Sequence, residues 1–149
     1  MDDSQLRYGE RAKHDADTMR EWTAVMGRCA DLLPLFADMH LKVQEPRAAK
    51  QLGLANTHAL RLWLLNRHLP RFVLLRDWYY VVHFVDRFAA GEDSISHWAM
   101  LRGDYPSVYY TFILRVTDLR WSDLRSRGPT WVRRRALQVW HSHIVVDQM

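Results

Sequence analysis

The feature that most constrains the fold of this chain is a short pattern that occurs twice, fifty residues apart. In AAKQLGLANTHAL, residues 48–60, an alanine stands four positions before a glycine, and WAMLRGDYPSVYY, residues 98–110, has the same spacing. The small alanine lets two helix backbones approach, and glycine adopts the left-handed conformation of a tight turn without a Cβ clash. The sequence therefore predicts two tight corners, each joining a pair of packed helices.

Apolar residues downstream of each glycine extend the repeat. An offset of fifty pairs Thr57 with Ser107, Leu60 with Tyr110, Leu64 with Leu114, Leu69 with Leu119 and Leu74 with Leu124. Residues four apart lie on one face of a helix. We therefore expect Leu60 and Leu64 to pack the second helix of the first corner onto its partner. Tyr110 and Leu114 are expected to do the same in the second corner.

The rest of the chain also has a helical pattern. Apolar residues recur at three- and four-residue steps, and no Asn-Gly or Asp-Gly hairpin signal occurs. The sequence thus predicts an all-α fold, with helices over residues 17–33, 45–52, 57–67, 70–90, 94–102, 107–116 and 122–125, and a last one from Pro129. Gly91 is expected to close the long helix, and Asp93 or Ser94 to cap the next one.

These helices suggest a domain organisation for the 149 residues. We expect a leader and helix over residues 1–31, then a double-corner domain over 32–128, and a C-terminal helix and tail over 129–149. Within the middle domain the corners cover about 45–68 and 94–117, and the linking helix covers about 70–90. At ~1.5 Å per residue that linker would be a rod about 30 Å long.

Three features bear on where the protein works. No apolar run reaches the ~18 residues of a spanning helix, so no membrane partner is expected. The N-terminal MDDSQLRYGE lacks the apolar core of a secretory signal. The lone Cys29 cannot form an internal disulfide, which points to a reducing compartment, the cytoplasm, and we expect it to be a buried small hydrophobe.

Positive charge is concentrated in the middle of the chain. The net charge is +4, but residues 44–135 alone hold 15 Lys and Arg against 8 Asp and Glu, and Lys50 is the only lysine among them. Arginine forms bidentate contacts with phosphates and with guanine edges. The distribution therefore favours a polyanionic partner, with a solvated basic face on an ordinary helical protein as the alternative.

The two corners and the tail that follows them resemble the DNA-binding domain of the AraC/XylS family of bacterial transcription regulators. The resemblance covers about Leu32 to Arg125 and is best in AAKQLGL and in HWAMLRGDYPSVYYTFILRVTDLRWSDLR. It implies two helix-turn-helix subdomains joined by one long helix. The sequence departs from the family pattern at Asp118, where glycine is usual, and at Trp121, where proline is usual. Leu62 and Phe112 occupy recognition-helix positions where arginine is common.

The resemblance implies double-stranded DNA as the partner, with two recognition helices in successive major grooves, which recur every ~34 Å. Positions off the packing stripe are the candidate base contacts: Asn56, Thr57, His58 and Arg61 in the first helix, and Ser107, Val108 and Thr111 in the second. Asn56 or Thr57 can instead be an N-cap. By resemblance, Arg76, Arg115 and Arg125 would hold phosphates, and Arg67 and Arg71 are phosphate candidates from their position.

One alternative function remains open, a helical protein-interaction module that uses the same scaffold to bind another protein. Leu62, Phe112 and the Tyr109–Tyr110 pair favour it. RNA polymerase or a regulatory protein is a further expected partner, and the protein is expected to be a monomer or homodimer. No nucleotide-binding, nucleophile or metalloprotease motif occurs, so no enzyme activity and no cofactor is predicted. His141 and His143 point apart on a helix, so no metal site is predicted either.

Overall fold

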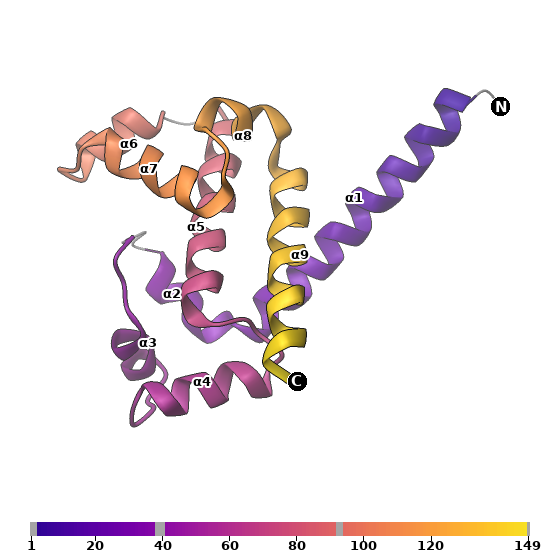
Figure 1. Ribbon diagram of the computed structural model, residues 1–149. Helices are drawn as coiled ribbons and strands as arrows, with labels where there is room; N and C mark the ends of the chain where they lie inside the picture. The colour runs from indigo at the N-terminus through magenta and orange to yellow at the C-terminus, as the bar shows by residue number, and fades with distance from the viewer. Residues whose placement is uncertain (1–2, 38–40, 92–93, 149) are drawn as a thin grey trace.

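The computed structural model describes residues 3–37, 41–91 and 94–148, and within these the chain is all-helical with no strand, as predicted. Figure 1 shows the arrangement. The elements are α1 (Asp3–Arg28), the 3₁₀ turn η1 (Ala30–Leu32), α2 (Leu33–Phe36), α3 (Glu45–Gln51), α4 (Thr57–Asn66), α5 (Phe72–Ala89), α6 (Ile95–Leu101), α7 (Pro106–Thr117), α8 (Trp121–Arg127) and α9 (Pro129–Gln148).

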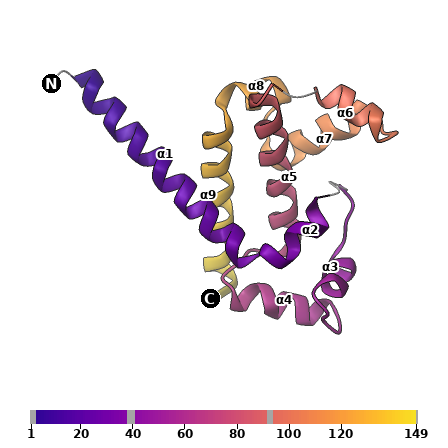
Figure 2. The ribbon, with the colours of Figure 1, turned by 180° about the vertical axis from the view of Figure 1, so that it is seen from behind.

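Helix α5 is the central element of the fold. Most of its residues are buried, from Phe72 near its start to Val85 near its end. Helix α9 runs beside α5 (Figures 1 and 2) and is tied to it by polar contacts. The Trp140 indole donates a hydrogen bond of 3.0 Å to the Leu74 carbonyl, and Arg133 pairs with Asp86. These contacts fix α9 as a rigid support along one side of α5.

Helix α1 is longer than the sequence indicated, because it begins at Asp3 rather than near residue 17. Its N-terminal half extends away from the other helices (Figures 1 and 2). Its C-terminal half packs on α9, where Trp22 stacks on Trp140 with ring centroids 5.3 Å apart. The buried side chains of α1, α5 and α9 belong to one cluster. The helices that we expected to flank the 32–128 domain therefore share a core with it.

Local signals in the sequence set most of the helix ends. Ser94 caps α6, because its hydroxyl accepts a hydrogen bond from the His97 amide at 3.2 Å. Asp93, the alternative cap, lies outside the described residues. Gly91 follows α5 with a φ of +76°, so it ends the long helix as predicted. Among the described residues no helix has the length and apolar character needed to cross a bilayer.

The environment of Cys29 also agrees with the sequence analysis. The side chain is fully buried, and its thiol lies 3.7 Å from the Met26 carbonyl. Burial raises the pKa of this thiol to about 11, because the low-dielectric interior disfavours the thiolate. Cys29 therefore serves as a small core residue.

Candidate functional site

The two predicted corners have the same backbone geometry. The amide of Leu54 donates to the carbonyl of Ala49 at 2.8 Å, and the amide of Asp104 donates to the carbonyl of Ala99 at 2.9 Å. Both alanines are buried. The intervening glycines have positive φ values of +70° and +74°, a conformation that glycine adopts without strain. The alanine and glycine positions of the repeat thus have the structural roles that the sequence predicts.

The prediction for the second helix of the second corner was wrong by one residue. Tyr110 and Leu114 are exposed, whereas Tyr109 and Ile113 are buried. The reason is a shorter turn. Helix α4 begins at Thr57, four residues after its glycine, but α7 begins at Pro106, three residues after its glycine. Within α4 and α7 the correct offset is therefore forty-nine. Phe112 is also buried, so it does not occupy an exposed recognition position.

The two helix pairs lie at opposite ends of α5. In Figures 1 and 2 α3 and the pair α6–α7 lie on the same side of α5, α4 crosses beneath the start of α5, and α9 lies on the other side. The α5 helix has 18 residues, which at ~1.5 Å per residue gives a length of about 27 Å. The spacer between the two pairs is therefore about 7 Å shorter than one turn of a DNA duplex, ~34 Å.

The outer face of α4 carries two of the four candidate base contacts predicted for it. His58 and Arg61 are exposed, and the Arg61 guanidinium lies 3.3 Å from the Glu45 carboxylate at the start of α3. Asn56 is the N-cap, and its side-chain oxygen accepts a hydrogen bond of 2.9 Å from the Ala59 amide. Thr57 is half-buried at the first helical position. Asn56 therefore has the capping role that the sequence left open.

On α7 the three predicted contacts Ser107, Val108 and Thr111 are all exposed. The Tyr110 hydroxyl lies 3.1 Å from the Ser96 hydroxyl on α6. Tyr110 is forty-nine residues after Arg61, so in both pairs this position of the second helix contacts the start of the first helix, through Glu45 in one pair and Ser96 in the other.

Tyr109, beside these residues on the buried face of α7, fixes the second corner. It donates a hydrogen bond from its hydroxyl to the Asp104 carboxylate in the turn. Burial and this neighbouring carboxylate both raise the pKa of Tyr109, so the phenol stays protonated and keeps the hydrogen bond at neutral pH. The turn before α7 is thereby tied to the core.

Four of the predicted phosphate contacts lie at or near the surface. Arg71 is exposed at the N-cap of α5. Arg115 is exposed and lies over the Phe112 ring at 5.5 Å, and Arg125 is exposed and lies over the Phe88 ring at 5.3 Å. Arg67 is half-buried, with its guanidinium 4.0 Å from the centre of the Trp63 ring.

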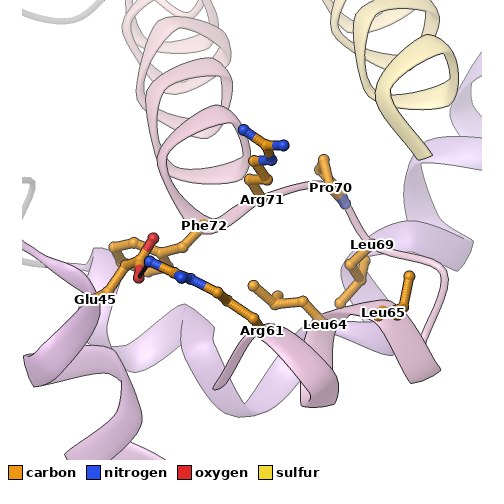
Figure 3. A pocket seen from close by; sticks show the side chains of 8 residues that line it. All are labelled: Glu45, Arg61, Leu64, Leu65, Leu69, Pro70, Arg71 and Phe72. Atoms are coloured by element: carbon orange, nitrogen blue, oxygen red, sulfur yellow. Dashed lines mark hydrogen bonds and ion pairs between the residues drawn. The ribbon is translucent and has the colours of Figure 1, made fainter. Parts of the chain in front are cut away.

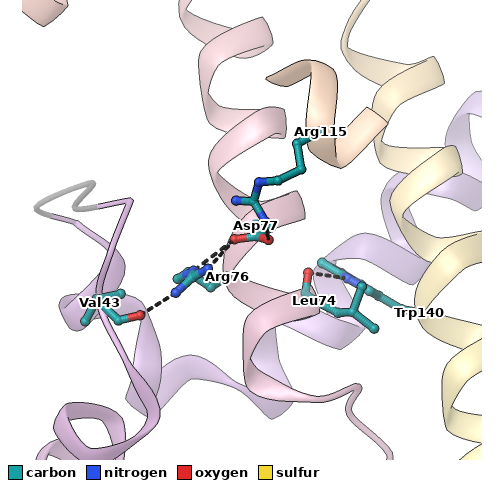
Figure 4. Close-up of polar contacts among 6 residues, drawn as sticks. All are labelled: Val43, Leu74, Arg76, Asp77, Arg115 and Trp140. Atoms are coloured by element: carbon teal, nitrogen blue, oxygen red, sulfur yellow. Dashed lines mark hydrogen bonds and ion pairs between the residues drawn. The ribbon is translucent and has the colours of Figure 1, made fainter. Parts of the chain in front are cut away.

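Arg76 does not take the phosphate role implied by the family resemblance. Its side chain is 7% exposed. The guanidinium donates to the Asp77 carboxylate at 2.9 Å and to the Val43 carbonyl at 2.6 Å, as Figure 4 shows. The second oxygen of Asp77 lies 3.9 Å from Arg115 on α7. Arg76 is therefore a buried structural residue, and its partner Asp77 lies between the segment that leads into α3 and the helix α7.

Comparisons with known proteins do not assign a family. No family model matches the sequence, and no curated protein or solved structure matches it either. The functional interpretation therefore depends on the geometry of the two helix pairs and on the chemistry of their exposed faces. Within residues 9–37, 41–91 and 94–144, where side chains are described, no three His, Cys, Asp or Glu side chains come together as a metal site would require.

Two further features of this surface were only partly recognised in the sequence, which singled out Leu62 and Val108 but not Leu65, Leu114 or Arg120. Four aliphatic side chains on the outer faces of α4 and α7 are between 39% and 47% exposed, namely Leu62, Leu65, Val108 and Leu114. Arg120, the N-cap of α8, is exposed, and nothing in its local sequence separated it from the other arginines. The repeat identifies it once the correct offset of forty-nine is applied, because Arg120 then aligns with Arg71.

Proposed function

We propose that this protein is a sequence-specific DNA-binding transcription regulator of the AraC/XylS type, with α4 and α7 as its recognition helices. The observation that carries the proposal is the duplication itself. Two helix pairs with the same corner geometry lie at the two ends of one helix, with α3 and the α6–α7 pair on the same side of it and α4 crossing beneath its start. A single rigid body of this kind can place one helix in each of two successive major grooves.

The exposed side chains of α4 and α7 offer different chemical groups to the base edges. His58 and Arg61 on α4 would contact base edges, and Arg61 can donate two hydrogen bonds to a guanine. On α7, Ser107 and Thr111 offer hydroxyl groups, and the Val108 methyl groups suit a thymine methyl. The second helix would therefore discriminate between bases less strongly than the first.

Arginines near the two helices would hold the DNA backbone. Arg67 and Arg71 follow α4, and Arg115 and Arg125 lie on α7 and α8. Contacts with phosphates fix the register of a protein on the duplex and do not select sequence. Four such contacts predict a slope of about −4 for log affinity against log salt concentration. We therefore expect the affinity to fall by about two orders of magnitude between ~50 and ~200 mM salt.

The test is DNA binding by fluorescence anisotropy. Two 24-bp duplexes serve as probes, one of random sequence and one enriched by the wild-type protein from a random library. Arg61→Ala and Thr111→Ala should reduce the preference for the enriched duplex, and Arg115→Ala should weaken binding to both duplexes equally. Arg135→Ala, an exposed arginine on α9, is the matched control and should change neither. Wild-type binding that does not depend on salt would contradict the proposal.

A second candidate function is favoured by the exposed aliphatic residues of α4 and α7. Leu62 and Leu65 on one helix and Val108 and Leu114 on the other would suit an apolar surface on another protein. This alternative predicts a different result in the same assay. Arg61→Ala, Thr111→Ala and Arg115→Ala would then all leave the DNA affinity unchanged.

A further inference from the structure

Two surface grooves of similar size lie beside the two recognition helices. The first, of about 480 Å³, lies between α4 and the start of α5 (Figure 3) and is lined by Glu45, Arg61, Leu64, Leu65, Leu69, Pro70, Arg71 and Phe72. The second, of about 410 Å³, lies between α7 and the start of α8 and is lined by Tyr110, Thr111, Leu114, Arg120, Trp121, Ser122 and Arg125. Each groove thus lies where a recognition helix meets the next helix of the chain.

The two grooves are built from equivalent positions of the repeat. At the offset of forty-nine, four lining residues of the first correspond to four of the second: Arg61 to Tyr110, Leu65 to Leu114, Arg71 to Arg120 and Phe72 to Trp121. The backbone agrees with this alignment. Arg71 and Arg120 are both N-cap residues in an extended conformation, with φ and ψ of −55° and 149° in one and −71° and 154° in the other.

Each groove combines a cation with an apolar wall. Arg71 and Arg120 are exposed. The exposed apolar surface beside them comes from Leu65 and Leu114, which are 39% and 46% exposed, whereas Phe72 is buried and Trp121 is half-buried. In the first groove the Glu45 carboxylate is paired with Arg61, and Figure 3 shows the Arg71 side chain directed away from this pair. Phosphodiester backbones have the complementary chemistry, because a charged phosphate alternates with a sugar that can pack against carbon.

We propose that the two grooves are equivalent binding sites for the DNA backbone, in which Arg71 and Arg120 each bind one phosphate. This inference rests on the proposed function and adds Arg120 to its contacts. A small free anion would need only one site. Two equivalent sites at the two ends of α5 suit a polymer that presents phosphates at regular intervals along one face. Because a contact with a phosphate carries no sequence information, both arginines would contribute affinity without selectivity.

The experiment compares Arg71→Ala, Arg120→Ala and the double variant with the wild type on the random and enriched duplexes, between ~50 and ~200 mM KCl. Each single substitution should make the slope of log affinity against log salt shallower by about 0.9, and the double variant by about 1.8. The affinity ratio between the two duplexes should stay at its wild-type value. Arg135→Ala on α9 again serves as the control, and thermal unfolding checks that each variant is folded.

The outcomes separate this inference from the proposed function. If the wild type shows steep salt dependence but Arg120→Ala leaves the slope of log affinity against log salt unchanged, the inference of two equivalent phosphate sites is wrong. The DNA-binding proposal would still stand. A change in the affinity ratio would also overturn the inference, because it would make the arginine a base contact. Wild-type binding that is insensitive to salt would overturn both, and would favour a protein on these surfaces.

Discussion

Asp77→Asn should destabilise the protein more than any surface substitution, although it changes only the charge of one side chain. Asp77 is 5% exposed and its partner Arg76 is 7% exposed. Two guanidinium nitrogens of Arg76 approach one carboxylate oxygen, at 2.9 and 2.8 Å. Removing the negative charge would leave a guanidinium buried without a counter-ion.

The expected loss of unfolding free energy follows from the burial of the Arg76–Asp77 ion pair. Breaking a buried ion pair from one side costs about 3–5 kcal/mol. Asparagine keeps one oxygen that can accept from Arg76, so we expect the lower end, about 3 kcal/mol. The contact with Arg115 adds little, because that side chain is 60% exposed and 3.9 Å away.

Urea unfolding followed by circular dichroism measures this effect. With a urea m-value of about 2 kcal/mol/M, the midpoint should fall by about 1.5 M. Two variants serve as controls. Asp123→Asn, at an exposed position of α8, should change stability by less than about 0.5 kcal/mol. Arg76→Met combined with Asp77→Leu should recover most of the loss, since neither charge then remains buried. A loss below about 0.5 kcal/mol for Asp77→Asn would refute the reasoning that the pair is buried and coupled.

Three further predictions address the fold. Tyr109→Ala should lower the free energy of unfolding by about 3–5 kcal/mol and Tyr110→Ala by less than about 1 kcal/mol, because only Tyr109 is in the core. Equal losses for the two variants in urea unfolding would disprove the corrected register of α7. Asp118→Gly should stabilise the protein by about 0.5–1 kcal/mol in thermal unfolding, because Asp118 has a φ of +58° and glycine adopts this conformation without strain; a lower melting temperature would argue against that backbone. Cys29 should react with a thiol reagent at pH 8 only as fast as the protein unfolds, because burial raises its pKa to about 11; rapid labelling of the native protein would exclude a buried thiol.

Much of the fold could be predicted because it depends on local rules. The corners needed only a small residue and a glycine at fixed spacing, so Ala49 and Gly53 and their counterparts Ala99 and Gly103 were identified from sequence alone. The helical class and the caps at Asn56 and Ser94 were accessible for the same reason.

The errors came from features that a local pattern does not encode. The turn before α7 is one residue shorter than the turn before α4, and this rotates the following helix so that Tyr109 is buried in place of Tyr110. Asp118 was noted as a departure from glycine, and its positive φ shows why glycine suits that position.

Non-local contacts decided which arginines are exposed. Arg76 is buried because a carbonyl 33 residues earlier, that of Val43, accepts its hydrogen bond, and periodicity carries no information on such a contact. Arg120 was missed because it aligns with Arg71 only at the offset of forty-nine, which follows from the helix starts in the structure. His58 was found because a helical wheel separates it from the packed Leu60–Leu64 face. Thr111 is exposed although the packed face predicted for α7 was wrong.

Hydroxyl-radical footprinting on the enriched duplex tests the central claim most directly. If α4 and α7 occupy successive major grooves, the wild-type protein should protect two clusters of backbone positions on one face of the DNA, centred about 10–10.5 bp apart. Arg115→Ala should weaken protection in the cluster contacted by α7 and leave the spacing unchanged. A single protected cluster, two clusters on opposite faces of the duplex, or no protection at concentrations that saturate the wild-type binding curve would contradict the account.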